Sequence, residues 1–409
     1  MSSVETQAAT AAPPASVADT KRAREPLFTR AFIVLFCFSF VTFFGAFQFL
    51  PAMPLRILDL HGTEAQAGWF LGAFTFASAS FSPLMGSIAD RFGRRRYLII
   101  GSVLFVGFAA LYSIIHSVPV LVVTGAIQGA VWSGLLAASG ALMSDAVPVS
   151  RRAEGLSYWG IASCGAIAVS PIIGLKVYSF SWNILCLEAG LLAVGMIIAA
   201  IAQREKPHNR VTGWQGLVSA GILDKNVFMV ALSLFMVSFG YGAMTSYIAL
   251  YCRAAHVKPE SIYFTVFATT IILARPALGR VADSIGHVKI LLPSLAVAAI
   301  GLAILALKPS MVTIVTSALV FGLGYGCAYP AFVAHMLGLT DPARRAQTFG
   351  SIVAAFDTGI GLGSILLGAV VAKYGFQSAF GLAAVIAMFS IPTFLTTERI
   401  MRKNKARAA

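Results

Sequence analysis

Long apolar stretches alternate with short polar segments along the whole chain. Within each stretch the apolar positions are continuous, unlike the apolar and polar alternation of membrane β-barrel strands, and a helix needs about 20 apolar residues to cross a bilayer. The pattern therefore predicts an all-α polytopic membrane protein with twelve transmembrane helices. They are expected near 31–51, 65–89, 97–115, 118–144, 154–177, 182–202, 227–251, 260–282, 288–307, 311–337, 348–372 and 377–396.

The longest polar break divides these helices into two groups of six. We expect an N-terminal tail at 1–30, one bundle at 31–202, a central loop at 203–226, a second bundle at 227–396 and a basic tail at 397–409. The first tail is rich in Ala, Ser, Thr and Pro, and no cleavage site follows a short apolar core. It is interpreted as a disordered cytoplasmic tail and not as a signal peptide.

Charge follows the predicted membrane topology. The chain has 30 Lys and Arg against 16 Asp and Glu, a net charge of +14, although only 11% of its residues are charged. If the helices alternate from a cytoplasmic N-terminus, most cations lie inside, and those outside are Arg56, Lys176, Arg253, Lys258, Lys308 and Lys373. The positive-inside rule thus predicts cytoplasmic termini. We expect a multi-pass protein of the plasma membrane (the inner membrane in a Gram-negative cell) and no nucleic-acid partner.

The two groups of helices also resemble each other in sequence. SPLMGSIADRFG at 82–93 aligns with RPALGRVADSIG at 275–286, and the same offset places Arg151 and Arg152 on Arg344 and Arg345. Separate segments sharing one offset indicate an internal duplication. Duplicated bundles that rock about a central site are the architecture of secondary transporters, so we predict two pseudo-symmetric six-helix bundles.

The densest motif lies in the turn between the second and third helices and contains Gly86, Asp90, Arg91, Gly93, Arg94, Arg95 and Arg96. Here Gly86 is expected to allow close helix approach, Gly93 to permit a turn with positive φ, and Asp90 to face a helix N-terminus. The motif resembles the signature loop of the major facilitator superfamily, G-x-x-x-D-R-x-G-R-[RK]-[RK]. The resemblance implies a twelve-helix fold and a cytoplasmic latch between its halves. A basic loop that only sets topology is the alternative.

The second copy of the motif is degraded. It keeps Gly279, Asp283 and Gly286, but Ser284 and His287 stand at two of the arginine positions. The latch is therefore expected to be asymmetric, with Asp283 as a helix N-terminal partner or part of a simple turn.

Within the superfamily, the resemblance is closest to the drug and metabolite proton-antiporter branch. That branch usually carries an arginine three residues before a Gln-Gly pair in helix 4, whereas here Gly125 precedes Gln128 and Gly129. The proline and small residues expected in helix 5 are only partly kept. Proton symport or uniport therefore remains an alternative to antiport.

Charged groups inside apolar helices are costly and default to functional candidates. Arg275 in helix 8, Asp357 in helix 11 and Glu188 in helix 6 are the proton-coupling candidates. An Arg275–Asp357 pair that exchanges partners is a usable coupling device. The alternatives are a static ion pair between helices 8 and 11 and, for Glu188, a position near the outer interface.

Neutral polar residues in helices 1, 4, 7 and 10 are candidates for the substrate cavity, because the resemblance implies that these helices surround it. The candidates are Gln48, Gln128, Tyr241, Tyr247, Tyr325 and Tyr329. Each is alternatively an interhelical hydrogen bond or an interface anchor.

No H-E-x-x-H, no nucleotide-binding G-x-x-x-x-G-K-[ST] and no metal-spaced His and Cys cluster occurs in the sequence. We therefore expect no enzyme activity, no catalytic residue, no cofactor and no metal. The predicted function is proton-coupled efflux of a drug-like compound or metabolite by a monomer, with the proton, the small-molecule substrate and the lipid bilayer as partners. The alternatives are a proton symporter or uniporter for metabolite uptake and, less favoured, a receptor or scaffold or an intramembrane enzyme.

Overall fold

The computed structural model describes residues 26–148, 151–203, 225–340 and 345–408. At 152–154, 156–157, 225–226, 275–284, 345–347, 349 and 402–408 the description is limited to the backbone. The predicted N-terminal tail and central loop lie almost wholly outside the described residues.

All described elements are helices. The first half contains α1 (Arg30–Phe47), α2 (Phe49–Asp59), α3 (Glu64–Ala67), α4 (Trp69–Phe92), α5 (Arg94–Ile114), α6 (Val118–Ala146), α7 (Arg152–Phe180) and α8 (Trp182–Ala202). The second half contains α10 (Lys225–Ala254), α11 (Ile262–Ile285), α12 (His287–Ile304), α13 (Met311–Gly338), α14 (Arg345–Met388) and α15 (Ser390–Ala408).

Every predicted transmembrane segment is present as one helix or as two helices in series, which confirms the predicted fold class. Among the described residues, 9 helical stretches are long and apolar enough to cross a membrane. One of them, Gly350–Met401, has 52 residues, far more than the roughly 20 that one crossing needs. Gly375, with φ of 82°, interrupts this stretch and separates the last two predicted segments.

The first predicted helix is broken at Gln48, which ends α1 and precedes α2. Pro51 and Pro54 follow in α2. A proline has no N–H to donate to the carbonyl four residues earlier, so the regular hydrogen-bond ladder cannot continue through 47–54. At the other end of the chain, α15 continues as a helix to Ala408, through the range predicted as a basic tail, because 397–408 contains many good helix formers such as Ala, Arg and Lys.

The internal duplication is visible in the backbone. Gly93 and Gly286 occupy equivalent turns with φ of 103° and 99°, a conformation that glycine adopts without strain. The helix contacts repeat as well. A side chain at Gly129 of α6 would overlap the carbonyl of Phe74 in α4, and one at Gly322 of α13 would meet the carbonyl of Phe267 in α11.

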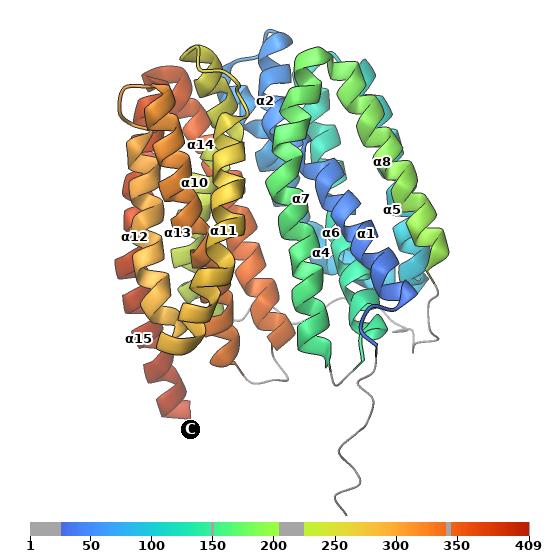
Figure 1. Ribbon diagram of the computed structural model, residues 1–409, viewed down its shortest axis with the longest axis vertical. Helices are drawn as coiled ribbons and strands as arrows, with labels where there is room; N and C mark the ends of the chain where they lie inside the picture. Colours follow the sequence, from blue (N-terminus) through green and yellow to red (C-terminus); the bar gives the residue numbers. More distant parts are fainter. Residues whose placement is uncertain (1–25, 149–150, 204–224, 341–344, 409) are drawn as a thin grey trace, which may run out of the picture.

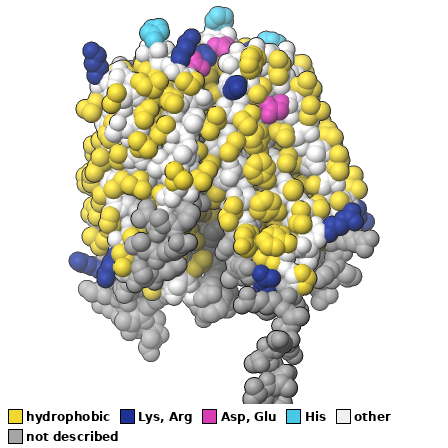
Figure 2. Space-filling view, in the orientation of Figure 1, with side chains coloured by type: hydrophobic (Ala, Val, Ile, Leu, Met, Phe, Trp, Pro, Cys, Tyr) yellow, Lys and Arg dark blue, Asp and Glu magenta, His cyan; other side chains and the backbone are white. Residues whose placement is uncertain are grey.

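The two halves lie side by side (Figure 1). Contacts between them join α4 and α3 to α14, α2 to α10, and α7 to α11. We call the end where α1 begins and α15 ends the basal end, and the end with the α2–α3 and α10–α11 turns the distal end. Hydrophobic side chains cover most of the face in Figure 2, and charged side chains gather near the two ends. This distribution fits a bilayer around the middle of the helices.

Substitution of Gly129 by Val is expected to destabilise the protein by about 2 kcal/mol or more, because the new side chain would overlap the α4 backbone. The measurement is thermal unfolding of the purified variant in detergent. Gly195→Val in α8 is the matched control, since a side chain there meets no atom within 4 Å. Equal midpoints for the two variants would contradict the close packing of α4 and α6.

Candidate functional site

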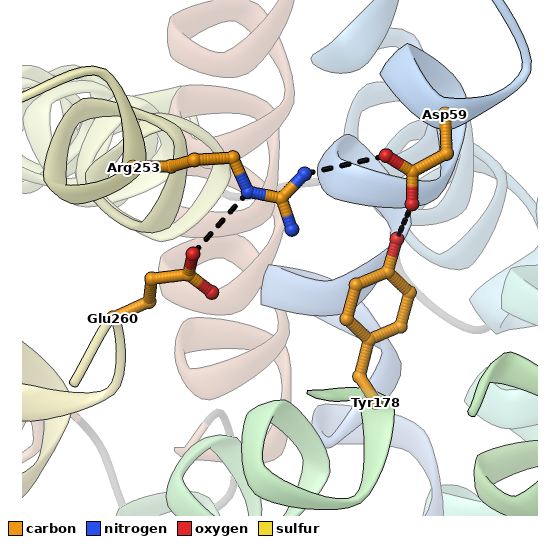
Figure 3. Close-up of polar contacts among 4 residues, drawn as sticks. All are labelled: Asp59, Tyr178, Arg253 and Glu260. Carbon is orange, nitrogen blue, oxygen red and sulfur yellow. Dashed lines mark hydrogen bonds and ion pairs between the residues drawn. The ribbon is translucent and has the colours of Figure 1, made fainter. Parts of the chain in front are cut away.

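A polar network joins the two halves at the distal end (Figure 3). Asp59, the last residue of α2, accepts a hydrogen bond from the Tyr178 hydroxyl of α7. Its other carboxylate oxygen lies 3.3 Å from Nη1 of Arg253 in α10. Glu260, in the turn after α10, lies 3.3 Å from Nε of the same arginine. Arg253 therefore links a carboxylate of the first half to one of its own half.

The helix ends help to position this network. Arg253 lies in the last turn of α10, where the negative end of the helix dipole favours a cation. Asp59 likewise lies in the last turn of α2. The dipole of that helix disfavours its negative charge, and the cationic partner Arg253 compensates. The side chains of Arg253 and Asp59 are 38% and 45% exposed, so water screens the pair and its contribution is about 1 kcal/mol or less. The contact is one that the protein can break at little cost.

A buried seal also joins the halves at this end. Ser364 of α14 donates to the carbonyl of Gly68, which precedes α4, at 2.8 Å. The hydroxyls of Ser246 in α10 and Ser364 are 2.6 Å apart, and Tyr247 donates to the Ser364 carbonyl at 2.8 Å. A side chain at Gly68 would overlap this carbonyl and the Tyr247 hydroxyl. The seal therefore depends on a glycine at position 68.

Among the described residues, hydrogen bonds and ion pairs that cross between the halves include those of Arg253 with Asp59 and of Ser364 with Gly68. Both lie at the distal end. Tyr247, predicted to line a substrate cavity, is only 1% exposed and lies in this seal.

The sequence motif lies at the basal end. Arg94 Nε is 2.7 Å from Asp90, and Arg94 Nη1 is 2.8 Å from Asp145 at the end of α6. Arg95 donates to the carbonyl of Ile201 at 2.7 Å. The described partners of these side chains all belong to the first half, so the motif ties α4, α5, α6 and α8 together. Arg91 and Arg96 are exposed.

Two features of this motif differ from the sequence analysis. The close helix approach expected at Gly86 is wrong for this conformation, because a side chain there would make an ordinary contact at 3.6 Å with Ala137. The role of Asp145 as a partner of Arg94 was not predicted. The sequence did contain a signal for it, because Asp145 is an acidic residue at a helix end that the predicted topology places beside the basic turn. Of the second motif copy, Gly286 is described as a turn, whereas Gly279, Asp283 and the nearby Arg275 are described by their backbone alone.

Aromatic rings from three helices of the second half lie together. Tyr241 of α10 stacks on Tyr325 of α13 with ring centroids 4.5 Å apart and planes 6° apart. Phe356 of α14 lies 4.9 Å from Tyr329 and 6.3 Å from Tyr325. Asp357 follows Phe356 in α14 and is partly buried. In the described part of the chain no hydrogen bond or ion pair reaches its carboxyl group, which makes Asp357 an exception to the usual pairing of charges within a membrane.

The remaining candidates lie in the first half. Gln48, at the break between α1 and α2, is fully buried, and neither its amide nitrogen nor its amide oxygen has a partner among the described residues. Gln128 accepts a hydrogen bond from Tyr112 at 2.6 Å and so joins α6 to α5. Glu188 lies in α8, which packs on α1, α5 and α7, and its Oε2 has no described partner. The structure does not bring Glu188 together with the aromatic group or with Asp357.

A family model described as Major Facilitator Superfamily matches residues 35–263 and 260–409. An uncharacterized MFS-type transporter of Burkholderia mallei (strain SAVP1) is 26% identical over 363 residues, which cover 86% of this chain and 88% of that protein. The staphylopine export protein of Staphylococcus aureus (strain Mu50 / ATCC 700699) is 24% identical over 382 residues, covering 85% and 91%.

Solved structures share the fold at low sequence identity. The nucleoside transporter NupG superposes with a TM-score of 0.71 at 16% identity, over 90% of this chain and 99% of that one. The human organic anion transporter MFSD10 (TETRAN) gives 0.67 at 14% identity, over 89% and 99%. These likenesses concern the fold alone.

Substitution of Gly68 by Val is expected to hold the distal seal open, since the new side chain would overlap Ser364 and Tyr247. The substitution Ser246→Cys, at a fully buried position, would report this opening as several-fold faster reaction with a water-soluble thiol reagent. The background lacks Cys37 and Cys164, the native cysteines that are not buried.

The control for this experiment is Gly107→Val, because a side chain at position 107 meets no atom within 4 Å. Slow labelling of the Gly68→Val protein, equal to that of the control, would show that the seal does not need a glycine.

Proposed function

The chain belongs to the Major Facilitator Superfamily, a family of membrane transporters, and we propose that it exports a drug-like compound or metabolite in exchange for protons. The observation that carries this proposal is the grouping of the described polar contacts between two related halves at one end. Two related bundles with breakable polar contacts between them at the distal end suit a rocking motion that opens and closes that end.

In the proposed cycle, the structure is the state closed at the distal end. Opening that end requires the loss of the Arg253–Asp59 pair and separation of Ser364 from Gly68. The first of these contacts is half-exposed, and the second is a small number of hydroxyl hydrogen bonds, each of which contributes about 1 kcal/mol. Binding of substrate or of a proton then shifts the equilibrium between the two states by the difference in its affinity for them.

The orientation follows from charge. The basal end carries Arg91, Arg94, Arg95 and Arg96, and the positive-inside rule assigns such an end to the cytoplasm. The protein is then a multi-pass protein of the plasma membrane with both termini inside, and the distal end, where the described polar contacts between the halves lie, faces away from the cytoplasm. The motif around Asp90 and Arg94, tied to Asp145, is the proposed latch that meets the second half when the basal end closes.

Asp357 is the proposed proton carrier. Its carboxyl group has no described partner and lies in α14, the helix that also carries Ser364 of the distal seal. Protonation would remove a charge from a helix that must move between the two states, and a change of charge in a poorly hydrated site is energetically large. The neighbouring Phe356, Tyr325 and Tyr329 supply aromatic surface that suits a partly apolar substrate.

Export is the proposed direction because of the resemblance to the drug and metabolite branch and because one relative is a staphylopine export protein. One observation favours the alternative of symport or uniport. At Gly125, where the antiporter branch usually has an arginine, a side chain would begin 2.6 Å from the Phe70 ring. This packing leaves no room for an arginine, so the proton-coupling arrangement of that branch is altered here.

Asp357→Asn is expected to abolish substrate-dependent proton movement, reducing it to the level of protein-free liposomes, because a side-chain amide does not bind and release a proton as a carboxyl group does. The measurement uses purified protein in liposomes that contain a pH-sensitive dye, screened against organic cations, anions and zwitterions. Proton movement opposite to the substrate indicates antiport, and movement with the substrate indicates symport.

Glu188→Gln is the comparison variant, since it removes a carboxyl group from α8 without touching the second half. Proton coupling lost in this variant and kept in Asp357→Asn would contradict the assignment. Substrate transport without proton movement in the wild type would indicate uniport or another coupling ion.

A further inference from the structure

A cavity lies at the distal end of the first half, among the end of α2, the end of α5 and the beginning of α8. Its volume is about 460 Å³, and it is lined by Arg56, Ser113, Ile114, His116, Ser181, Trp182 and Asn183. The volume falls in the range of small-molecule sites. All lining residues belong to the first half, so the cavity is separate from the contact between the halves.

Arg56 is the charged group of this cavity. Its guanidinium carbon lies 5.3 Å from the centre of the Trp182 ring, and the Trp182 indole N–H donates to the carbonyl of Tyr112 at 2.8 Å. The ring is thereby fixed and holds the guanidinium by a cation–π contact. Arg56 Nε is buried and has no hydrogen-bond partner among the described residues. A guanidinium held in this way keeps donors that match the oxygens of a phosphate or carboxylate.

The rest of the lining favours an anion. It contains no carboxylate, and Asp59, one turn after Arg56, is already bound by Tyr178 and Arg253. The N-terminus of the long helix α8 at Trp182 adds positive potential, while its Asn183 N–H is already capped by the Ser181 hydroxyl at 3.2 Å. His116 Nδ1 donates to the carbonyl of Ile114 at 2.8 Å, so its Nε2 is a donor to an anion only when the imidazole carries both protons.

The cavity also opens where lipid reaches the protein. Ile114, one of its lining residues, is 67% exposed, and Ile184 and Leu187 in the first two turns of α8 are 50% and 63% exposed. Apolar side chains exposed on membrane helices contact acyl chains, and tryptophan is enriched where a protein crosses the interface. A phosphate at Arg56 could therefore belong to a molecule whose tail lies along α8.

We propose that this cavity binds a phosphate group, carried either by a phospholipid of the distal leaflet or by a soluble phosphate. Arg56 binds the phosphate oxygens, and the side-chain amide of Asn183 and the hydroxyl of Ser113 or Ser181 in the lining supply further donors. The site is independent of the transported substrate and of the proton-coupling residues.

The test uses the purified full-length protein in detergent, titrated with dioctanoyl phosphatidylglycerol or with inorganic phosphate, and follows the thermal unfolding midpoint. The wild type is expected to be stabilised in a saturable manner. The Arg56→Gln protein is expected to bind each ligand at least about tenfold more weakly, because it loses charge-assisted hydrogen bonds. Lys308→Gln, which removes an exposed cation from the second half, is expected to respond as the wild type does.

A second variant guards against misfolding of Arg56→Gln. Asn183→Asp places a carboxylate in the cavity while favouring the start of α8, and it should also lose the response. Stabilisation by the lipid alone identifies a headgroup site, and stabilisation by both ligands identifies a general phosphate site. No stabilisation of the wild type, or equal affinity in the Arg56→Gln, Asn183→Asp and Lys308→Gln proteins, would overturn the proposal.

Discussion

The structure depends on one constraint, which is that backbone polar groups within a bilayer must be satisfied inside each segment. This constraint makes every crossing a helix. Because lipid tails are as apolar as the helix surfaces, the hydrophobic effect adds little force between helices in the bilayer, and packing at short range has to hold them together. Glycine permits that packing here. Side chains at Gly242 of α10 and Gly363 of α14 would overlap backbone carbonyls of the opposite helix, at Ile360 and Phe239. The same device joins α6 to α4 in the first half, and each half is therefore a tightly packed unit.

Contacts between the halves are of another kind. They combine glycine positions with hydroxyl groups, as at Gly68, Ser364 and Tyr247, and with the half-exposed pair of Arg253 and Asp59. Hydroxyl groups can exchange one partner for another or for water, and an exposed ion pair is easily broken. Separating interdigitated backbones within a half would lose far more contacts. Closely packed halves with a hydroxyl-rich junction between them fit the alternating access proposed for this protein.

Much of this arrangement could be predicted from the sequence because it depends on local signals. Apolar length predicted the helices, and the repeated motif predicted equivalent turns at Gly93 and Gly286. The distal network could not be predicted in the same way. Asp59 and Arg253 are 194 positions apart, and each alone is an ordinary charge in a loop. Gln128 has a buried tyrosine hydroxyl as its partner, which no pattern along the chain reveals. The contacts of such residues depend on which helix faces meet. Sequence reasoning therefore missed these residues or assigned them to a cavity.

Buried polar groups without a described hydrogen-bond partner are informative here, because many other buried polar groups of this chain have one. Trp159 donates to Ser39, and Ser246 and Ser364 bind each other, so interhelical partners form readily in this fold. Against that background Gln48, which is buried and has no partner for either amide atom among the described residues, carries a desolvation penalty of about 1 to 3 kcal/mol for each group. Asp357, without a described partner in a membrane helix, is a similar exception in the other half. A penalty of this kind is removed when a proton, a water molecule or a polar substrate arrives. In the proposed cycle, each half thus holds a group whose free energy falls on binding, and a fall that differs between the two states would drive the rocking motion.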